Sequence, residues 1–242
     1  MTGAEPAGRS ESAMEFVLVH GGWQGGWAWD GVRAALESGG HTVFAPTLRG
    51  RTLAEMAGGL IQEVEERDLR EVVAVGHSGG GPVVQIVADR LGRRVLRTVF
   101  LSAWILGDGQ SINDTRPTEA VAASRAEAAR RADNSVPMDP GRWASSFMQD
   151  ATAGQLAAVT PRLVPVPYEW YEQPADLPRF FELCLPASYI FLTSDRAAPR
   201  ERYASMAARL ERPLLLECEG SHEAMLTRPE AVAAALLAAT GT

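Results

Sequence analysis

Short apolar runs alternate with amphipathic stretches along most of this chain. The apolar, β-branched runs predict buried strands near residues 15–19, 42–45, 71–75, 98–102, 188–193 and 213–218. The amphipathic stretches predict helices near residues 27–38, 52–67, 82–91, 200–210 and 229–239. Strands that alternate with helices form a parallel sheet with helices on both faces, so the pattern predicts the α/β class. Such sheets bind ligands at the carboxyl ends of their strands.

A serine lies in a glycine-rich turn between a predicted strand and a predicted helix. Residues 76–80 read Gly-His-Ser-Gly-Gly, and Pro82 follows in the first turn of the helix. A G-x-S-x-G motif in this context is a nucleophile elbow, whose strained turn exposes the serine hydroxyl at the edge of the sheet. Ser78 is therefore the candidate nucleophile. An ordinary strand-to-helix turn is the alternative interpretation, and two further segments weigh against it.

Two other strand ends carry the groups that an activated serine needs. The first strand runs into His-Gly-Gly at residues 20–22, and attack on a carbonyl creates an oxyanion that needs two fixed N–H donors. Gly79, directly after Ser78, is one candidate donor, and Gly22 is the other. The last strand ends in a loop of small residues with His222, which is the candidate base for the serine proton.

A carboxylate is needed to orient the catalytic histidine. Asp195 directly follows a predicted strand, and the chain order Ser78, Asp195, His222 is typical of this architecture. Asp108 is the alternative acid, because it also follows a strand. His20 is interpreted as a residue that shapes its loop and not as a base.

Together these motifs resemble the α/β-hydrolase superfamily, and within it the small plant-type methylesterase and hydroxynitrile-lyase family. The resemblance covers most of the chain from about Met14 onward and is carried by residues 16–22, 25–29, 40–43, 75–78, 99–103 and 220–225, followed by Pro229. It implies an α/β-hydrolase fold of about six mostly parallel strands flanked by helices, with a helical cap over the active site.

Two positions separate this chain from the lyase branch of that family. The lyase branch has a threonine directly after the first strand's histidine and a lysine after the catalytic histidine, whereas this chain has Gly21 and Glu223. The chain is therefore similar to the esterase branch. The segment that follows Gly50 is also shorter than is usual in the family, which implies a more open wall of the pocket.

Residues 107–186 interrupt the alternation of strands and helices and are rich in aromatic residues, proline and methionine. By the resemblance, they form a helical cap inserted into a core of residues 14–106 and 187–242, within a single domain. Aromatic side chains on both parts predict a largely apolar substrate pocket. Its candidate residues are Trp23, Trp104, Trp143, Phe147, Tyr168 and Trp170.

Composition restricts the classes of partner. The 242 residues carry a net charge of −7 without a basic run, which argues against binding of nucleic acid. All 23 basic residues are arginine, which excludes lysine Schiff-base chemistry. Arg49 could bind an acidic substrate, although a surface salt bridge is the favoured interpretation. Cys184 and Cys218 are predicted to be buried and unpaired.

Several kinds of site and cellular location are not expected, because the sequence lacks the motifs that would indicate them. The sequence contains no cofactor motif and no cluster with metal-ligand spacing, so neither a cofactor nor a metal is expected. Residues 1–13 are predicted to be a disordered tail, and no apolar run has the length of a membrane span. These features predict a cytoplasmic protein with no membrane partner. The oligomeric state is left open, with a homodimer as one option.

The motifs predict a serine hydrolase. Its substrate would be a carboxylic ester, such as a methyl ester or lactone of a small, largely apolar molecule, cleaved through an acyl-enzyme. Three alternatives stay open: a lyase or acyl-transfer step on the same triad, a small-molecule receptor with little turnover, and a structural protein on a hydrolase scaffold.

Overall fold

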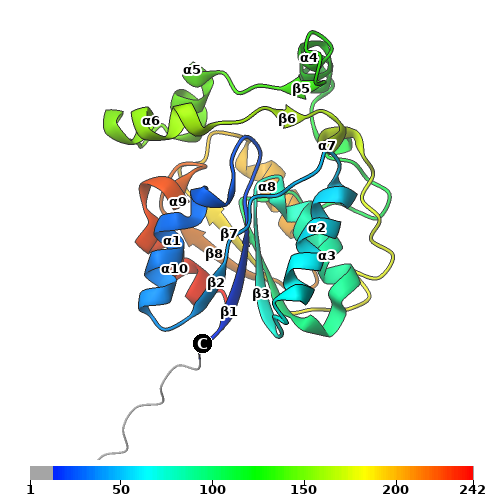
Figure 1. Ribbon diagram of the computed structural model, residues 1–242, viewed down its shortest axis with the longest axis vertical. Helices are drawn as coiled ribbons and strands as arrows, with labels where there is room; N and C mark the ends of the chain where they lie inside the picture. The colour runs from blue at the N-terminus through cyan, green and yellow to red at the C-terminus, as the bar shows by residue number, and fades with distance from the viewer. Residues whose placement is uncertain (1–12, 242) are drawn as a thin grey trace, which may run out of the picture.

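Six strands form one sheet in the order β2-β1-β3-β4-β7-β8, and every pairing in it is parallel (Figure 1). The computed structural model describes residues 13–241, so the predicted tail lies outside the described residues except for Ala13. The strands are β1 (Glu15–Val19), β2 (Thr42–Phe44), β3 (Val72–His77), β4 (Val95–Leu101), β7 (Ala187–Leu192) and β8 (Leu214–Cys218). The predicted α/β class and parallel sheet are confirmed.

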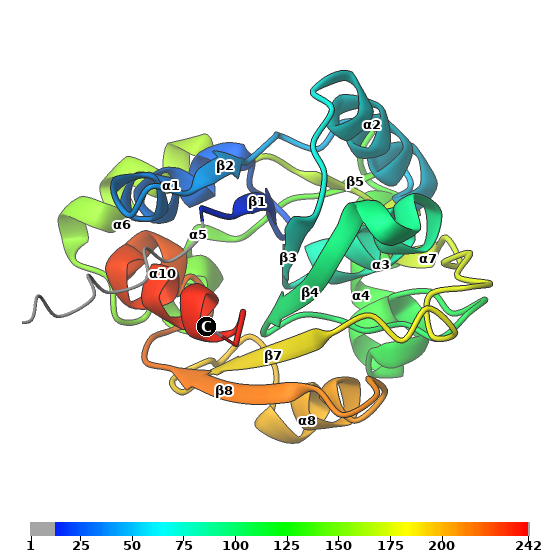
Figure 2. The same ribbon diagram turned by 90° about the horizontal axis from the view of Figure 1, so that it is seen from below.

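Helices cover both faces of this sheet, because alternate strand residues point to opposite sides. Val17 and Val19 of β1 join one apolar cluster, whereas Phe16 and Leu18 join another. The first cluster lies under α2 (Leu53–Glu66), α3 (Gly80–Leu91) and α8 (Arg200–Ala207). The second lies under α1 (Asp30–Ser38), α9 (Ala224–Thr227) and α10 (Pro229–Ala238). Figure 2 shows these helices on the two sides of the strands from below.

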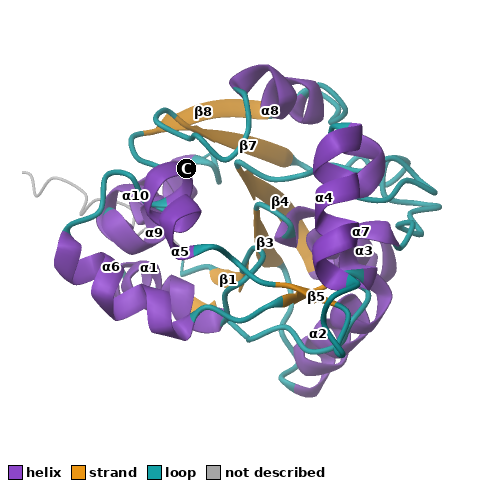
Figure 3. Ribbon diagram, turned by 90° about the horizontal axis from the view of Figure 1, so that it is seen from above, coloured by secondary structure: helices purple, strands orange, loops and turns teal. Residues whose placement is uncertain are grey.

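Residues 107–186, which we call the cap segment, connect β4 to β7. Figure 1 shows most of this segment above the α/β layer, and Figure 3 shows its helices to either side of the central strands. Its helices are α4 (Thr118–Ala128), α5 (Pro140–Arg142), a π-helix (Trp143–Phe147), α6 (Ala153–Val159) and α7 (Glu169–Glu172). A short antiparallel pair, β5 (Ser135–Val136) with β6 (Val166–Pro167), joins its two halves.

The structure bears on two expectations from the sequence, namely the burial of the cysteines and the absence of a membrane span. Cys184 is exposed and has a left-handed φ of +46°, so the prediction that it is buried is wrong, whereas Cys218 is buried. The exposed position follows from its place in the irregular chain before β7, outside the strand that would have buried it. Among the described residues, none of the helices combines the length and hydropathy that a transmembrane span requires.

Helix α3 crosses the sheet at very short range. A Cβ added to Gly81 would lie 2.2 Å from the carbonyl oxygen of Trp104, and one added to Gly80 would lie 2.6 Å from that of His20. Helix α3 begins at Gly80, two residues before the predicted start, because the turn at Ser78 leads directly into it. The missing side chains therefore set the distance between α3 and the loops that follow β1 and β4.

We expect Gly81→Ala to destabilise the protein by about 3 kcal/mol or more, since the new methyl group overlaps a backbone atom that cannot rotate away. Gly58→Ala is the matched control: Gly58 is exposed on α2, and an added Cβ there meets nothing within 4 Å. That variant should gain about 0.5–1 kcal/mol from reduced backbone entropy. Urea unfolding of both variants beside the parent checks this, and equal stability of the two would contradict it.

Candidate active site

Ser78 lies at the carboxyl end of β3, in a backbone conformation that few L-residues adopt. Its φ is +51°, and its carbonyl oxygen accepts hydrogen bonds from the N–H groups of Gly81 and Trp104 at 3.1 and 3.0 Å. Its own N–H donates to the carbonyl of Leu101 at 3.2 Å. Three backbone bonds thus hold the strained turn. The hydroxyl makes no hydrogen bond within residues 13–241, so it is not tied to a structural partner.

His222 and Asp195 form a buried pair. His222 Nδ1 donates to Asp195 Oδ2 at 2.7 Å, and the two side chains are only 2% and 4% exposed. Because a carboxylate can only accept, Nδ1 carries the proton and Nε2 holds the free lone pair of the neutral ring. Burial alone would lower the pKa of His222, but the charge and hydrogen bond of Asp195, with the charge of Glu223, raise it.

Two strand-end loops meet to bring this pair together. Beyond the paired residues of β7 and β8, Thr193 N–H donates to the Cys218 carbonyl at 3.0 Å and Ser194 N–H to the Gly220 carbonyl at 2.9 Å. The next residue on the first loop is Asp195. Its other oxygen, Oδ1, accepts the N–H of Ala197 at 2.8 Å, which fixes the orientation of the carboxylate.

Asp108 lies elsewhere. Its Oδ1 accepts the backbone N–H of Leu177 at 2.8 Å, which is a contact inside the cap segment. It makes no hydrogen bond or ion pair with His222. Of the two acids considered from the sequence, Asp195 is the one that contacts the histidine.

The cap segment holds the loop of His222 from above. The backbone carbonyl of Phe147 accepts the N–H of Glu223 at 3.1 Å, and Asp150 Oδ2 accepts the N–H of Ser221 at 3.1 Å. The ring of Phe147 also contacts the His222 ring edge-on, with 5.2 Å between centroids. Phe147 ends the π-helix, a geometry that is often found next to functional sites.

The N–H groups of Gly22 and Gly79 are unused. Neither donates a backbone hydrogen bond within the described part of the chain. The indole of Trp170 packs against both glycines: an added Cβ would lie 3.1 Å from its ring at Gly22 and 2.7 Å at Gly79. Trp170 therefore forms one wall beside both amides, and larger residues at these two positions would displace it.

His20 shapes the loop that carries Gly22. Its Nε2 accepts the N–H of Leu48 at 3.0 Å, so Nδ1 carries the proton and donates to the Gly21 carbonyl at 2.8 Å. Burial lowers the pKa of His20 to about 4, in spite of the bond to Gly21. A neutral ring with both nitrogens occupied by backbone groups agrees with a structural role.

The aromatic residues predicted for the pocket occupy four different places. Trp23, Trp143 and Phe147 form one cluster, in which Trp143 stacks on Phe147 with 5.3 Å between centroids and Trp23 meets Phe147 edge-on at 5.8 Å. Trp170 lies over the two glycines described above, whereas the Tyr168 hydroxyl accepts a hydrogen bond from Asn113 at 3.2 Å. Trp104 supports the turn at Ser78 through its backbone N–H.

A cavity of about 200 Å³ adjoins this site. It lies between the loop after β1 and the cap segment, and its lining includes Gly21, Trp23, Gln24 and Trp170. This is the cavity that combines aromatic walls with proximity to Ser78, since an added Cβ at Gly21 would lie 2.9 Å from Ser78 Cβ.

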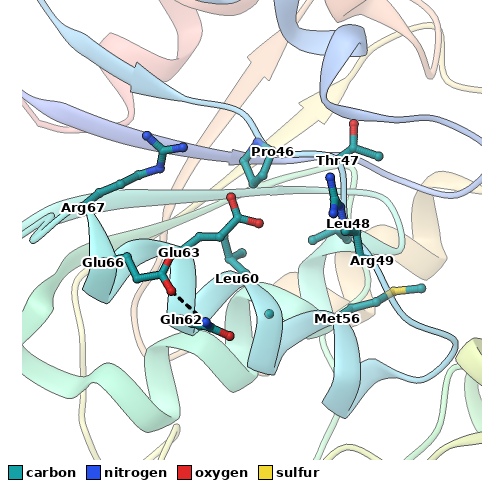
Figure 4. A pocket seen from close by; sticks show the side chains of 11 residues that line it. Pro46, Thr47, Leu48, Arg49, Met56, Leu60, Gln62, Glu63, Glu66 and Arg67 are labelled. Atoms are coloured by element: carbon teal, nitrogen blue, oxygen red, sulfur yellow. Dashed lines mark hydrogen bonds between the residues drawn. The ribbon is translucent and has the colours of Figure 1, made fainter.

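A larger cavity, of about 630 Å³, lies away from Ser78 along α2 (Figure 4). It shares Leu48 and Met56 with the smaller cavity, and its lining is mostly polar and charged. Arg49 faces it and is exposed. Arg49 forms no ion pair with the described residues, so the surface salt bridge predicted for it is not found there.

Three parts of this site could not be found from motifs. The Tyr203 hydroxyl of α8 makes a long hydrogen bond of 3.4 Å with His222 Nδ1, and its ring stacks on the His222 ring with 6.4 Å between the centroids. Asp150 of the cap segment holds the histidine loop. Gln24 Nε2 donates a very short hydrogen bond to the buried carboxyl of Glu223. Burial raises the pKa of Glu223 to about 7, opposed by the nearby His222 and Gln24.

One group of side chains could in principle share a metal ion. His77, His222 and Glu223 offer ligand atoms that all lie within 4.8 Å of one another. His77 Nε2 already donates to the His222 carbonyl at 3.0 Å, and His222 Nδ1 is bound to Asp195. We interpret the group as an acid–base cluster, because His222 and Glu223 already bind Asp195 and Gln24, whereas His77 Nδ1 has no partner among the described residues.

Comparison with known proteins agrees with this geometry. An esterase of a Nocardioides strain that hydrolyses carbendazim is 37% identical over 108 residues, which are 40% of this chain and 45% of that protein. Salicylic acid-binding protein 2 of Nicotiana tabacum is 33% identical over 107 residues, which are 39% of this chain and 41% of that protein. The chain thus matches less than half the length of these curated relatives.

The solved structures extend the comparison over nearly the whole chain. An extracellular α/β-hydrolase of a Paenibacillus species, described as structurally and functionally homologous to the tobacco protein, has a TM-score of 0.88 and 28% identity. The alignment covers 93% of this chain and 98% of that one. The sequence model of the alpha/beta hydrolase family matches residues 16–235. The chain belongs to the alpha/beta hydrolase family.

Proposed function

We propose that the protein is a serine esterase that hydrolyses a carboxylic ester through an acyl-enzyme. The observation that carries the proposal is the buried hydrogen bond between His222 and Asp195, beside a serine with a left-handed φ and a free hydroxyl. A structural protein has no need of a strained serine and a buried ion pair at the same strand ends. The names of the relatives, which include esterases and methylesterases, support the same class of reaction.

The proposed reaction has two halves. In the first, His222 Nε2 takes the proton of Ser78 while Asp195 holds the ring in the required tautomer, and Ser78 attacks the ester carbonyl. The N–H groups of Gly22 and Gly79 stabilise the oxyanion, and the alcohol leaves with the proton from His222. In the second half, His222 activates a water molecule, which releases the acid and restores Ser78.

The substrate is proposed to be a methyl ester or lactone of a small, largely apolar molecule. Support comes from the aromatic walls formed by Trp23 and by Trp170 of the cap segment, and from the cavity of about 200 Å³ that they line. A cavity of this size suits a compact acyl group more than a long chain.

We expect Ser78→Ala to lose at least about 10³-fold in kcat/KM on short-chain p-nitrophenyl esters, because no nucleophile remains. Ser205→Ala is the matched control: Ser205 is exposed on α8, and its hydroxyl only contacts the carbonyl of Arg202. That variant should keep its full activity. Both should unfold at the temperature of the parent protein.

The outcomes separate the candidate functions. Full turnover by Ser78→Ala would refute the proposed nucleophile. No turnover by a folded parent protein that still binds apolar ligands would favour the receptor hypothesis. Product analysis of any substrate that is consumed distinguishes hydrolysis from a lyase or acyl-transfer outcome.

Asp195→Asn should reduce kcat by about 10³- to 10⁴-fold, since an amide can hold the wrong tautomer of His222 and cannot stabilise its charge. Asp108→Asn is the control, because an asparagine oxygen can still accept the Leu177 N–H that Asp108 binds. It should change kcat less than about twofold. Steady-state kinetics on one ester measures both, and a greater loss in Asp108→Asn would reverse the assignment of the acid.

A further inference from the structure

Glu223 is a second carboxyl beside His222, and the proposed reaction does not use it. Its side chain is 1% exposed, yet it makes no ion pair with arginine among the described residues. Among the described residues, the one hydrogen-bond partner of its carboxyl group is Gln24 Nε2, from the loop after β1. Gln24 is itself 3% exposed, and its Oε1 atom has no partner. A carboxyl buried with so few donors needs a compensating role.

The contact between Gln24 and Glu223 joins two loops of the proposed active site. Gln24 lies two residues after Gly22, and Glu223 directly follows His222. Trp23, between Gly22 and Gln24, has a left-handed φ of +65°, so the loop turns sharply at this point. The contact therefore fixes the spacing between one proposed oxyanion donor and the histidine.

The charged and titratable groups around Glu223 come from three elements. His222 and Glu223 offer atoms within 4.8 Å of each other, and His77, at the end of β3, lies within the same distance. Asp195, after β7, acts on Glu223 as a like charge. Burial lowers the pKa of His77 far below its usual value, as does the charge of His222, so His77 is neutral. His222 is thus the group near Glu223 that can carry a positive charge.

We propose that Glu223 is a positioning residue for His222. The ionised carboxylate of Glu223 stabilises the imidazolium that forms when His222 takes the serine proton, and through Gln24 it holds the loop of Gly22. This inference rests on the proposed function. The negative charge of the Glu223 carboxylate favours a protonated His222 in the transition state.

The geometry has a consequence for the pH dependence of the reaction. Burial raises the pKa of Glu223 to about 7, so the group is neutral in acid and ionised in base. Its support of the imidazolium is therefore absent at low pH and present at high pH. His222 and Glu223 titrate as a coupled pair, and the rise of activity with pH reports on both groups.

Glu223→Gln tests this directly, because it keeps the shape and the hydrogen bond to Gln24 and removes only the ionisation. We expect the ratio of kcat/KM between the parent protein and Glu223→Gln to grow from about one below pH 6 to about ten at pH 9, with the loss in kcat and not in KM. Glu230→Gln removes the same charge from an exposed position on α10 and should give a ratio of one at every pH.

A structural role for Glu223 predicts a different result, namely a ratio that does not change with pH, and that result would overturn the inference. Glu223→Asp, which keeps the charge, should restore the pH dependence in part. Gln24→Met should move the step in the ratio to higher pH, since Gln24 lowers the pKa of Glu223. If the pH of this step does not move in Gln24→Met, that result also counts against the inference.

A second measurement needs no substrate. The chain contains 4 histidines, so NMR titration can follow His222 individually. We expect its pKa to fall by about one unit in Glu223→Gln and to stay unchanged in Glu230→Gln. An unchanged pKa of His222 in both variants refutes the inference. The proposed esterase function is tested separately, by the turnover of the parent protein and of Ser78→Ala and by the products formed.

Discussion

The left-handed turn at Ser78 is the constraint on which the site depends. A non-glycine residue at φ +51° costs on the order of 1–2 kcal/mol, so the surroundings must hold it in place. They do so through the Ser78 carbonyl, which accepts two backbone N–H groups, and through the close crossing of α3 at Gly81. The same crossing fixes the loop after β4, because Trp104 donates one of these bonds. Ser78 is thus held by backbone atoms alone, which leaves its side chain free.

Parallel pairing explains why segments far apart in the sequence meet at this turn. The strands β1, β3, β7 and β8 all end at the same edge of the sheet, so their loops bring together Gly22, Ser78, Asp195 and His222. The cap segment then adds contacts from above, through the Phe147 carbonyl and Asp150, that restrain the histidine loop. The sheet determines which loops meet, and the cap segment determines how far the histidine loop can move.

Hydrophobic patterning predicted the bounds of the six strands to within a few residues, because buried strands and amphipathic helices each have a characteristic spacing of apolar residues. The contact of Asp195 with His222 was also foreseeable, because strand ends and chain order restrict which side chains can meet. Tyr203, Asp150 and the Gln24–Glu223 contact were not. Gln24 and Glu223 lie 199 residues apart, and the contacts of Tyr203 and Asp150 depend on how α8 and the cap segment pack, which no local pattern encodes. The exposure of Cys184 was missed for the same reason.

Two carboxyl groups, those of Asp195 and Glu223, lie beside the imidazole of His222 and accept hydrogen bonds from different donors. Asp195 accepts hydrogen bonds from His222 Nδ1 and from the backbone N–H of Ala197. Glu223 has only Gln24, so burial dominates and raises its pKa to about 7. The like charge of Asp195 adds to the rise in the pKa of Glu223. The surroundings thus give Asp195 a direct orienting contact with the imidazole of His222, and they give Glu223 a charge that depends on pH beside the same ring.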